Sequence, residues 1–168
     1  MTQRTRTFSW SDPLATAGAV RDLPGLDAIR MVAAAELPPP PIAELLGMTI
    51  TKVERGHVIF ALEPAEWMYN PIGSVHGGIA ATILDSSLGC AVHTTLDAGV
   101  GYTTTDLQVR YVRAIGAETG RVLAESHVVH SGRRLATAEG RLYVEASGQL
   151  LALTWVVALA VSRIRSVA

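Results

Sequence analysis

The sequence predicts an α+β protein in which an antiparallel sheet wraps around one long central helix. A mostly apolar segment at residues 77–95 has the composition of a helix and follows two short strand-like segments. Four further strand-like segments come after it, separated by glycine-containing turns. One of them, 134–146, alternates apolar and polar residues, as a strand with one buried and one solvated face does. Because a single long helix must be buried by the sheet, we expect the sheet to wrap around it.

The length of 168 residues fits one domain, with an N-terminal extension at 1–41, a main domain at 42–162 and a tail at 163–168. Four consecutive prolines end the extension and enforce an extended chain. In the last strand we expect Trp155, Val157 and Leu159 to lie in the core. The expected elements, in chain order, are a loose arm at 1–23, helices at 26–36 and 42–46, strands at 48–53 and 57–62, the helix at 77–95, and strands at 100–113, 119–130, 134–146 and 149–162.

The composition argues against several classes of protein. The formal net charge of −1 provides no positive field for nucleic acid, and no nucleic-acid-binding motif replaces it. The first residues contain no apolar signal segment, and the most hydrophobic run, 150–161, is too short to span a membrane. Hydrophobic residues make up 49% of the chain against 17% charged. This balance favours an oligomer, because one copy has more apolar surface than it can readily bury.

Cysteine and histidine usage indicates a reducing compartment and no metal. Cys90 is the only cysteine, so no disulfide can form within the chain, and we expect a cytoplasmic protein. None of the five histidines has a cysteine or an acid at metal-ligand spacing along the chain. His127 and His130 should lie on opposite faces of a strand. We therefore expect no metal site.

A polar, glycine-rich loop at 70–78 runs directly into the long helix and is the most informative segment. Gly77 and Gly78 at the helix start leave backbone N–H groups unhindered, at the positive end of the helix dipole. Such a helix start can hold a negatively charged oxygen. Asp85 and Ser86 lie on the same helix, on a small and polar stripe that can line a groove. A carboxylate together with an oxyanion donor indicates acyl transfer or hydrolysis.

An ordered set of residues around this loop resembles a known family. The set consists of Asn70, His76-Gly77-Gly78 and Asp85, followed by a threonine-containing strand that ends near a tyrosine and by a Ser-Gly-Arg turn. It resembles the hotdog-fold acyl-CoA thioesterases of the phenylacetate-degradation type, over residues 42–162. The resemblance implies a hotdog fold and the hydrolysis of an acyl-CoA to a free carboxylic acid and CoA.

The resemblance also implies a role for each matching residue. Asp85 would be the catalytic carboxylate, acting as general base on water or as nucleophile. The Gly77 N–H would bind the thioester carbonyl oxygen. Asn70 and His76 would position the attacking water or order the loop, and Thr104 would help to orient water. CoA enters only as part of the substrate, so no cofactor is implied.

Further residues are candidates for substrate binding, each with a structural alternative. Gly78 extends the helix start that can bind an anion, and Ser86 faces the expected groove. Arg133 and Arg134 suit the phosphates of CoA, or are solvated charges of a turn. Trp67, just before the motif, lines the acyl pocket or holds the loop.

The spacing of Gly77 and Asp85 predicts a dimer. Eight residues of helix separate them, which is about 12 Å along the axis. Both groups must act within about 3 Å of one carbonyl group, so one helix cannot supply both. Two antiparallel helices across a twofold axis can, with Gly77 of one subunit facing Asp85 of the other. We therefore expect a homodimer with two equivalent sites, and the resemblance implies pairing of such dimers into tetramers.

Three alternatives to acyl-CoA hydrolysis stay open. A hotdog dehydratase or hydratase uses a different arrangement of histidine and acid on the helix, which this sequence lacks. A non-catalytic acyl-CoA-binding or regulatory protein needs no carboxylate beside a carbonyl, so Asp85 and Gly77 argue against it. Thioesters of acyl carrier protein can replace CoA esters, and the sequence does not choose between the two carriers.

Overall fold

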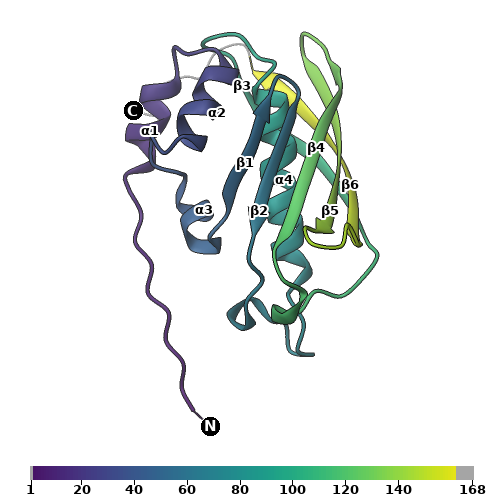
Figure 1. Ribbon diagram of the computed structural model, residues 1–168. Helices are drawn as coiled ribbons and strands as arrows, with labels where there is room; N and C mark the ends of the chain where they lie inside the picture. Colours follow the sequence, from purple (N-terminus) through teal and green to yellow (C-terminus); the bar gives the residue numbers. More distant parts are fainter. Residues whose placement is uncertain (1, 162–168) are drawn as a thin grey trace.

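The structure is a computed structural model that describes residues 2–161, and its main feature is an antiparallel sheet packed on one long helix (Figure 1). The sheet has six strands in the order β1-β2-β4-β5-β6-β3. The predicted α+β class is confirmed, and every strand end lies within three residues of its expected position. The strands are β1 Thr49–Glu54, β2 His57–Leu62, β3 Gly101–Tyr111, β4 Val122–Ser131, β5 Leu135–Val144 and β6 Leu150–Val161. The tail expected at 163–168 lies outside the described residues.

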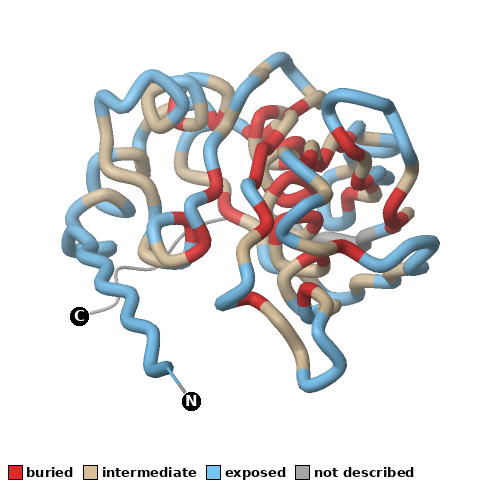
Figure 2. The backbone as a smooth tube through the Cα atoms, turned by 60° about the horizontal axis from the view of Figure 1, so that its bottom comes forward, coloured by how far each residue is buried: buried red, intermediate tan, exposed pale blue. Residues whose placement is uncertain are grey.

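Helix α4, Gly77–His93, covers one face of the sheet, which we call the inner face. Ile83, Leu84 and Leu88 on this helix are fully buried. Each such side chain contributes about 1.5–3 kcal/mol when it leaves water. The alternation expected in β5 is confirmed by four buried residues, Ala136, Ala138, Leu142 and Val144. In Figure 2 the buried segments gather in the centre of the molecule, away from the exposed N-terminal arm.

A buried hydrogen bond fixes the rotation of α4 on the sheet. The hydroxyl oxygens of Ser87 on α4 and Ser126 on β4 lie 2.6 Å apart. Gly140 on β5 leaves room for this pair, since a Cβ there would lie 2.7 Å from the Ser126 hydroxyl. Residues two apart on a helix point in widely different directions. With Ser87 directed at β4, Asp85 is directed away from β4.

Three helices form the N-terminal extension: α1 Pro13–Val20, α2 Gly25–Ala33 and α3 Pro41–Leu46. The helices expected at 26–36 and 42–46 are confirmed. Part of the arm expected to be loose at 1–23 forms helix α1, with the Asp12 side chain accepting a hydrogen bond from the Leu14 N–H at 2.9 Å. None of the residues of α1 is buried. It therefore carries no core-facing apolar stripe that would reveal it in the sequence.

Helix α2 packs against β1 and α4. Gly25 allows this close approach, because a Cβ at that position would lie 1.8 Å from the carbonyl oxygen of His93 at the end of α4. The Gly25 N–H also donates to the Leu96 carbonyl at 3.1 Å. Ala28, one turn further on, is 2% exposed. The extension is thus fixed to the main domain at the helix that carries Asp85.

The two edges of the sheet are β1 and β3. Strand β3 has eleven residues and pairs with β6 along one side. Its other side is an edge, where backbone groups are available to another strand. The pairing of β3 with β6 shifts register between Thr104 and Asp106, a bulge close to the candidate site.

One expectation for β6 is wrong. Trp155 does not lie in the core: it is 45% exposed and pairs with Glu139 of β5 on the outer face, opposite α4. The run at 150–155 is apolar on both faces except for Thr154, so its pattern does not indicate which face is buried. The side chains of Val157 and Leu159 lie outside the described part of the chain.

Candidate active site

Asp85 lies in the middle of α4 and is held by a residue from β3. The Thr104 hydroxyl donates a hydrogen bond to Asp85 Oδ1 at 2.9 Å. The structure therefore brings together these two predicted site residues, which are 19 positions apart in the sequence. A carboxylate fixed in this way keeps one orientation, which proton transfer to or from a bound water requires.

Asp85 opens into a cavity of about 470 Å³ between α4, the sheet and the N-terminal extension. Ser86, another predicted site residue, also lines it. No basic side chain forms an ion pair with Asp85 in the described part of the chain. The apolar part of the wall includes Ile29 and Val32 of α2, Pro39 and Pro40 of the proline segment, and Ile50 and Phe60 of the sheet.

Two further groups beside Asp85 stay protonated. Burial raises the pKa of Cys90 to about 12, and the charge of Asp85 adds to the effect. Burial likewise raises the pKa of Tyr102 well above its usual value, with smaller contributions from Cys90 and Asp85. The Tyr102 ring packs on Gly89, where a Cβ would lie 2.2 Å from the tyrosine hydroxyl. The Cys90 side chain is therefore a protonated thiol at neutral pH rather than a thiolate.

The start of α4 forms the second part of the candidate site. His76 caps the helix, with its Nδ1 accepting a hydrogen bond from the Gly78 N–H at 2.9 Å. Within the described residues, the structure gives the preceding N–H, that of Gly77, no acceptor. The Tyr111 hydroxyl donates to the Gly77 carbonyl at 3.0 Å. A Cβ at Gly77 would lie 3.1 Å from the Tyr111 ring, so glycine fits closely here.

Asn70 shapes the loop that leads into α4. Its Oδ1 accepts hydrogen bonds from the N–H groups of Ile72 at 3.0 Å and Ser74 at 3.2 Å. Its Nδ2 donates to the Ser74 hydroxyl at 3.0 Å. In the single chain, Asn70 and His76 therefore both fix the geometry of the loop that presents Gly77.

The two parts of the site remain apart within one chain. Gly77 lines a separate hollow of about 320 Å³ together with Val75, Tyr111 and Arg113. The eight residues of helix between Gly77 and Asp85 correspond to about 12 Å, since α4 runs without interruption from one to the other.

Three predicted substrate-binding residues lie away from Asp85. Trp67 does not line the Asp85 cavity. The Arg6 guanidinium lies over the Trp67 ring instead, with Arg6 Cζ 3.7 Å from the ring centroid. Arg133 and Arg134 are exposed in the turn between β4 and β5. That turn lies at the C-terminal end of α4, where the hydroxyl oxygens of Thr95 and Ser131 are 3.0 Å apart.

Sequence reasoning did not identify the wall that α2 and the prolines add to the Asp85 cavity. The signal was present, because Ile29 and Val32 lie three positions apart on the predicted helix at 26–36. What the sequence does not reveal is which part of the domain this apolar stripe covers.

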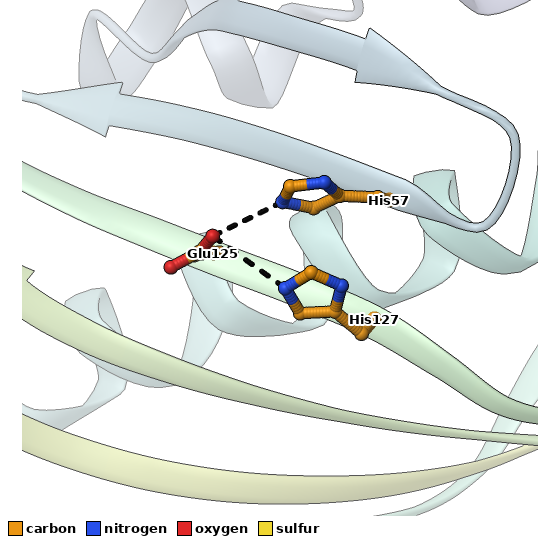
Figure 3. A group of neighbouring side chains, drawn as sticks. All are labelled: His57, Glu125 and His127. Carbon is orange, nitrogen blue, oxygen red and sulfur yellow. Dashed lines mark hydrogen bonds and ion pairs between the residues drawn. The ribbon is translucent and has the colours of Figure 1, made fainter.

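A second group of side chains, on the outer face, was also not predicted. His57, Glu125 and His127 lie together on β2 and β4 (Figure 3). Partial burial acts to raise the pKa of Glu125, but the hydrogen bonds and charge of Arg141 together with His57 and His127 outweigh it, so the pKa of this carboxyl is lowered. His57 and Glu125 are 68 positions apart in the sequence, so no local spacing reveals the group.

None of the helices in the described residues has the length and apolar character needed to cross a membrane.

Known proteins resemble this chain in sequence and fold. The model of the thioesterase superfamily matches residues 72–150, which include Gly77, Asp85 and Thr104. Acyl-coenzyme A thioesterase 13 from Homo sapiens is 29% identical over 106 residues, which are 62% of this chain and 74% of that protein.

Two solved structures extend the likeness. One, from the thioesterase superfamily, is 30% identical with a TM-score of 0.64, and the match covers 75% of this chain and 90% of that one. A phenylacetic acid degradation-related protein from Ralstonia eutropha JMP134 is 25% identical with a TM-score of 0.70, over 77% of this chain and 97% of that one.

Proposed function

The chain belongs to the thioesterase superfamily and has its hotdog fold, and on this premise we propose that it hydrolyses acyl-CoA thioesters to a free carboxylic acid and CoA. The observation that carries the proposal is Asp85, which lines a cavity of about 470 Å³ and accepts a hydrogen bond from Thr104. This carboxylate has no basic partner among the described residues and faces apolar surface, which suits a thioester carbonyl whose acyl group is apolar.

We infer that the complete site forms between two subunits. A carbonyl attacked at Asp85 lies too far from the Gly77 N–H of the same helix for a hydrogen bond. Strand β3, which carries Thr104 and ends at Tyr111, is an edge of the sheet. Pairing of two β3 strands across a twofold axis would join two sheets and set two α4 helices antiparallel. Each Asp85 would then meet Gly77 of the partner subunit.

In this arrangement Asp85 acts as a general base. It takes a proton from water as the oxygen attacks the thioester carbon, and Thr104 keeps the carboxylate in place. The N–H of the partner subunit's Gly77 binds the oxyanion, a contribution of about 3–4 kcal/mol to the transition state. When the C–S bond breaks, the proton on Asp85 passes to the departing thiolate, which leaves as CoA.

Direct attack by Asp85 on the carbonyl is the alternative to this general-base route. It would form a mixed anhydride that water then hydrolyses. A single turnover in ¹⁸O-labelled water establishes the anhydride route when the label is found in Asp85. The general-base route puts the label in the acid product alone, whereas the anhydride route, if water attacks the Asp85 carbon, puts it in Asp85.

The acyl group would occupy the Asp85 cavity, between α4 and α2. Its wall supports an aromatic or medium-length acyl chain over a strongly polar one, since Ile29, Val32 and Phe60 line it. Ser86, at the same wall, would contact the substrate near the carbonyl.

The CoA end would lie toward the partner. Antiparallel helices bring the C-terminal end of one α4, with Arg133 and Arg134, toward the loop before the other α4, which holds Trp67 and leads to Gly78. Arginine suits the phosphates of CoA, and these two are exposed. The single cysteine, Cys90, suits a cytoplasmic enzyme that releases a thiol.

A panel of thioesters tests the activity. Thiol release is measured with acyl-CoA esters of increasing length, aromatic acyl-CoA esters and the matching esters of acyl carrier protein. We expect the wild-type protein to hydrolyse CoA esters, and we expect Asp85→Asn to abolish this activity. Tight acyl-CoA binding without thiol release would identify a binding protein instead, and turnover of carrier-protein esters alone would change the substrate.

Mixing two inactive variants tests the shared site. Gly77→Pro removes the N–H donor, and proline is well tolerated at the first position of a helix. Gly77→Ala, which keeps the N–H, controls for the contact with Tyr111. In dimers reassembled from Asp85→Asn and Gly77→Pro chains, one of two sites in each mixed dimer has both groups. With random pairing, activity should return to about one quarter of wild type. No recovery in verified mixed dimers would place both groups in one subunit.

A further inference from the structure

The outer face of the sheet carries a cluster of His57, Glu125 and His127, which the sheet register brings together (Figure 3). His57 on β2 pairs directly with His127 on β4. Glu125 is two residues before His127 on the same strand, and side chains two apart point to the same face. Three potential metal ligands therefore extend from adjacent positions on two paired strands. They lie on the face opposite α4 and Asp85.

The distances within the cluster suit a tetrahedral metal ion. His57 Nε2 lies 3.1 Å from Glu125 Oε1, and His127 Nε2 lies 3.5 Å from the same oxygen. All three ligand atoms lie within 4.8 Å of one another. Zinc bonds of about 2.0–2.1 Å in a tetrahedron put neighbouring ligand atoms about 3.4 Å apart. The two imidazoles are stacked in this structure, with ring centroids 3.9 Å apart, so they must turn out of the stack for both Nε2 atoms to face one ion.

Neighbouring side chains hold the ligands as outer-shell groups do in metal sites. Glu54 Oε2 lies 3.4 Å from the other ring nitrogen of His57, Nδ1. A carboxylate at this position selects the tautomer that leaves Nε2 for a metal. On the other side, Arg141 donates two hydrogen bonds to Glu125 Oε2, from Nε at 3.0 Å and Nη2 at 2.8 Å. Oε1 therefore stays directed at the two histidines.

Burial also favours a site with access from one side. The side chains of His57 and Glu125 are 15% and 13% exposed, whereas that of His127 is 51% exposed. Beside them lies a hollow of about 340 Å³, lined by His127, Glu139, Arg141 and Trp155 among others. Glu139 pairs with His127 across β4 and β5. This hollow leaves room for water, or for the Glu139 carboxylate, as a fourth ligand.

We propose that His57, Glu125 and His127 form a binding site for a divalent transition metal, with Zn²⁺ as the ion that fits it best. Two imidazoles and one carboxylate are ligands that zinc accepts, whereas Mg²⁺ and Ca²⁺ prefer oxygen alone. A metal here links β2 to β4 on the side of the sheet away from Asp85. It stabilises the fold and takes no part in thioester hydrolysis.

Metal titration of the full chain, with any affinity tag removed and bound metal stripped by a chelator, tests this site. Calorimetry with Zn²⁺ should give one equivalent per subunit, and Co²⁺ should give the intense visible bands of a four-coordinate ion. His57→Ala and His127→Ala should each weaken binding at least about tenfold. Glu54→Gln, which alters only the outer shell, should weaken it by about tenfold.

His130→Ala is the matched control, because His130 is exposed on the same strand beyond a shift in its register. It should bind the metal as wild type does. Zn²⁺ should raise the melting temperature of wild type and of His130→Ala, and that of His127→Ala much less. If His57→Ala does not fold, the half-exposed His127 provides the variant that does. Absence of saturable binding to wild type, or equal affinity in His127→Ala, would overturn the proposal. Thioesterase activity is a separate measurement and is unaffected by either result.

Discussion

Asp85 and Glu125 are both partly buried carboxylates on opposite sides of the same sheet, and their surroundings differ. Asp85 accepts a hydrogen bond from the neutral Thr104 hydroxyl and faces a largely apolar cavity. Glu125 contacts His57, His127 and the Arg141 guanidinium. A carboxylate surrounded by such donors is a poor base, because its charge is already stabilised. This difference is the reason that we propose Asp85, and not Glu125, as the group that accepts a proton.

The largest expected effect is that of Asp85→Asn. The amide keeps an oxygen that accepts the Thr104 hydrogen bond, so the fold should be retained, but it cannot take a proton from water. We expect kcat for thiol release to fall by at least about 10³-fold. Asp97→Asn, in the exposed turn after α4, is the control. Near-normal turnover in Asp85→Asn would show that Asp85 is not the group that accepts the proton.

Filling the Asp85 cavity should have the next largest effect. Val32→Phe adds volume to the α2 wall, so acyl chains that reach this wall should be rejected. We expect kcat/KM for a medium-chain ester to fall about tenfold or more relative to that for acetyl-CoA. Arg30→Ala, on the exposed side of the same helix, should leave this ratio unchanged. An unchanged ratio in Val32→Phe would mean that the acyl group binds elsewhere.

Thr104→Val tests the comparison further, because it removes the one hydrogen-bond donor to the Asp85 carboxylate found in the described part of the chain. Valine has nearly the same shape, so the strand should be preserved while the carboxylate loses its fixed orientation. We expect kcat to fall about tenfold with little change in KM. Thr104→Ser, which keeps the hydroxyl, should recover most of the activity. If valine and serine behave alike, Thr104 has only a packing role.

The smallest of these effects is expected for Glu125→Gln, which should lower stability rather than activity. Loss of this charge leaves Arg141 and the two histidines without their shared partner. In metal-free buffer we expect the free energy of unfolding to fall by about 1–3 kcal/mol. Denaturant unfolding measures it, with the exposed Glu139→Gln as control, for which a change below about 0.5 kcal/mol is expected.

The same substitution should change the dependence of stability on pH. The pKa of Glu125 is lower in the folded chain than its ordinary value, so the unfolded chain binds the proton more readily. The ionised Glu125 carboxylate therefore makes its full contribution to the free energy of unfolding above the ordinary glutamate pKa of about 4.3. This contribution is lost as the pH falls through the lower pKa of the folded chain. Wild type and Glu125→Gln should consequently converge in stability at acid pH. A constant difference across that range would assign the effect of the mutation to packing.

The sequence was sufficient for the elements of the main domain because their patterns are local. In the strand at 134–146 and the apolar helix at 77–95, the pattern of apolar residues along the chain indicates which segments are buried. Helix α1 has no buried face and Trp155 lies in a run apolar on both faces, so their positions could not be predicted in the same way.

The candidate site likewise has one part that a local motif reveals and another part that depends on tertiary packing. Asp85, Gly77 and the loop before them form one continuous motif, which is why the sequence identifies them. The wall supplied by α2 and the cluster of His57 and Glu125 depend on how distant segments pack. Strand pairing and helix docking create these contacts, and neither leaves a local spacing in the sequence.

The order of strands in the sheet also governs the order of events in folding. The edge strand β3 joins the sheet by pairing with β6, for example Gly101 with Val161, although β4 and β5 lie between these two strands in the sequence. Hairpins such as β4–β5 close short loops, whereas the β3–β6 pairing closes a long one at a greater entropic cost. A newly made chain therefore has no finished β3 edge to offer a second copy until β6 has paired with it. Assembly of two chains would then be a late step that reports on correct folding of each.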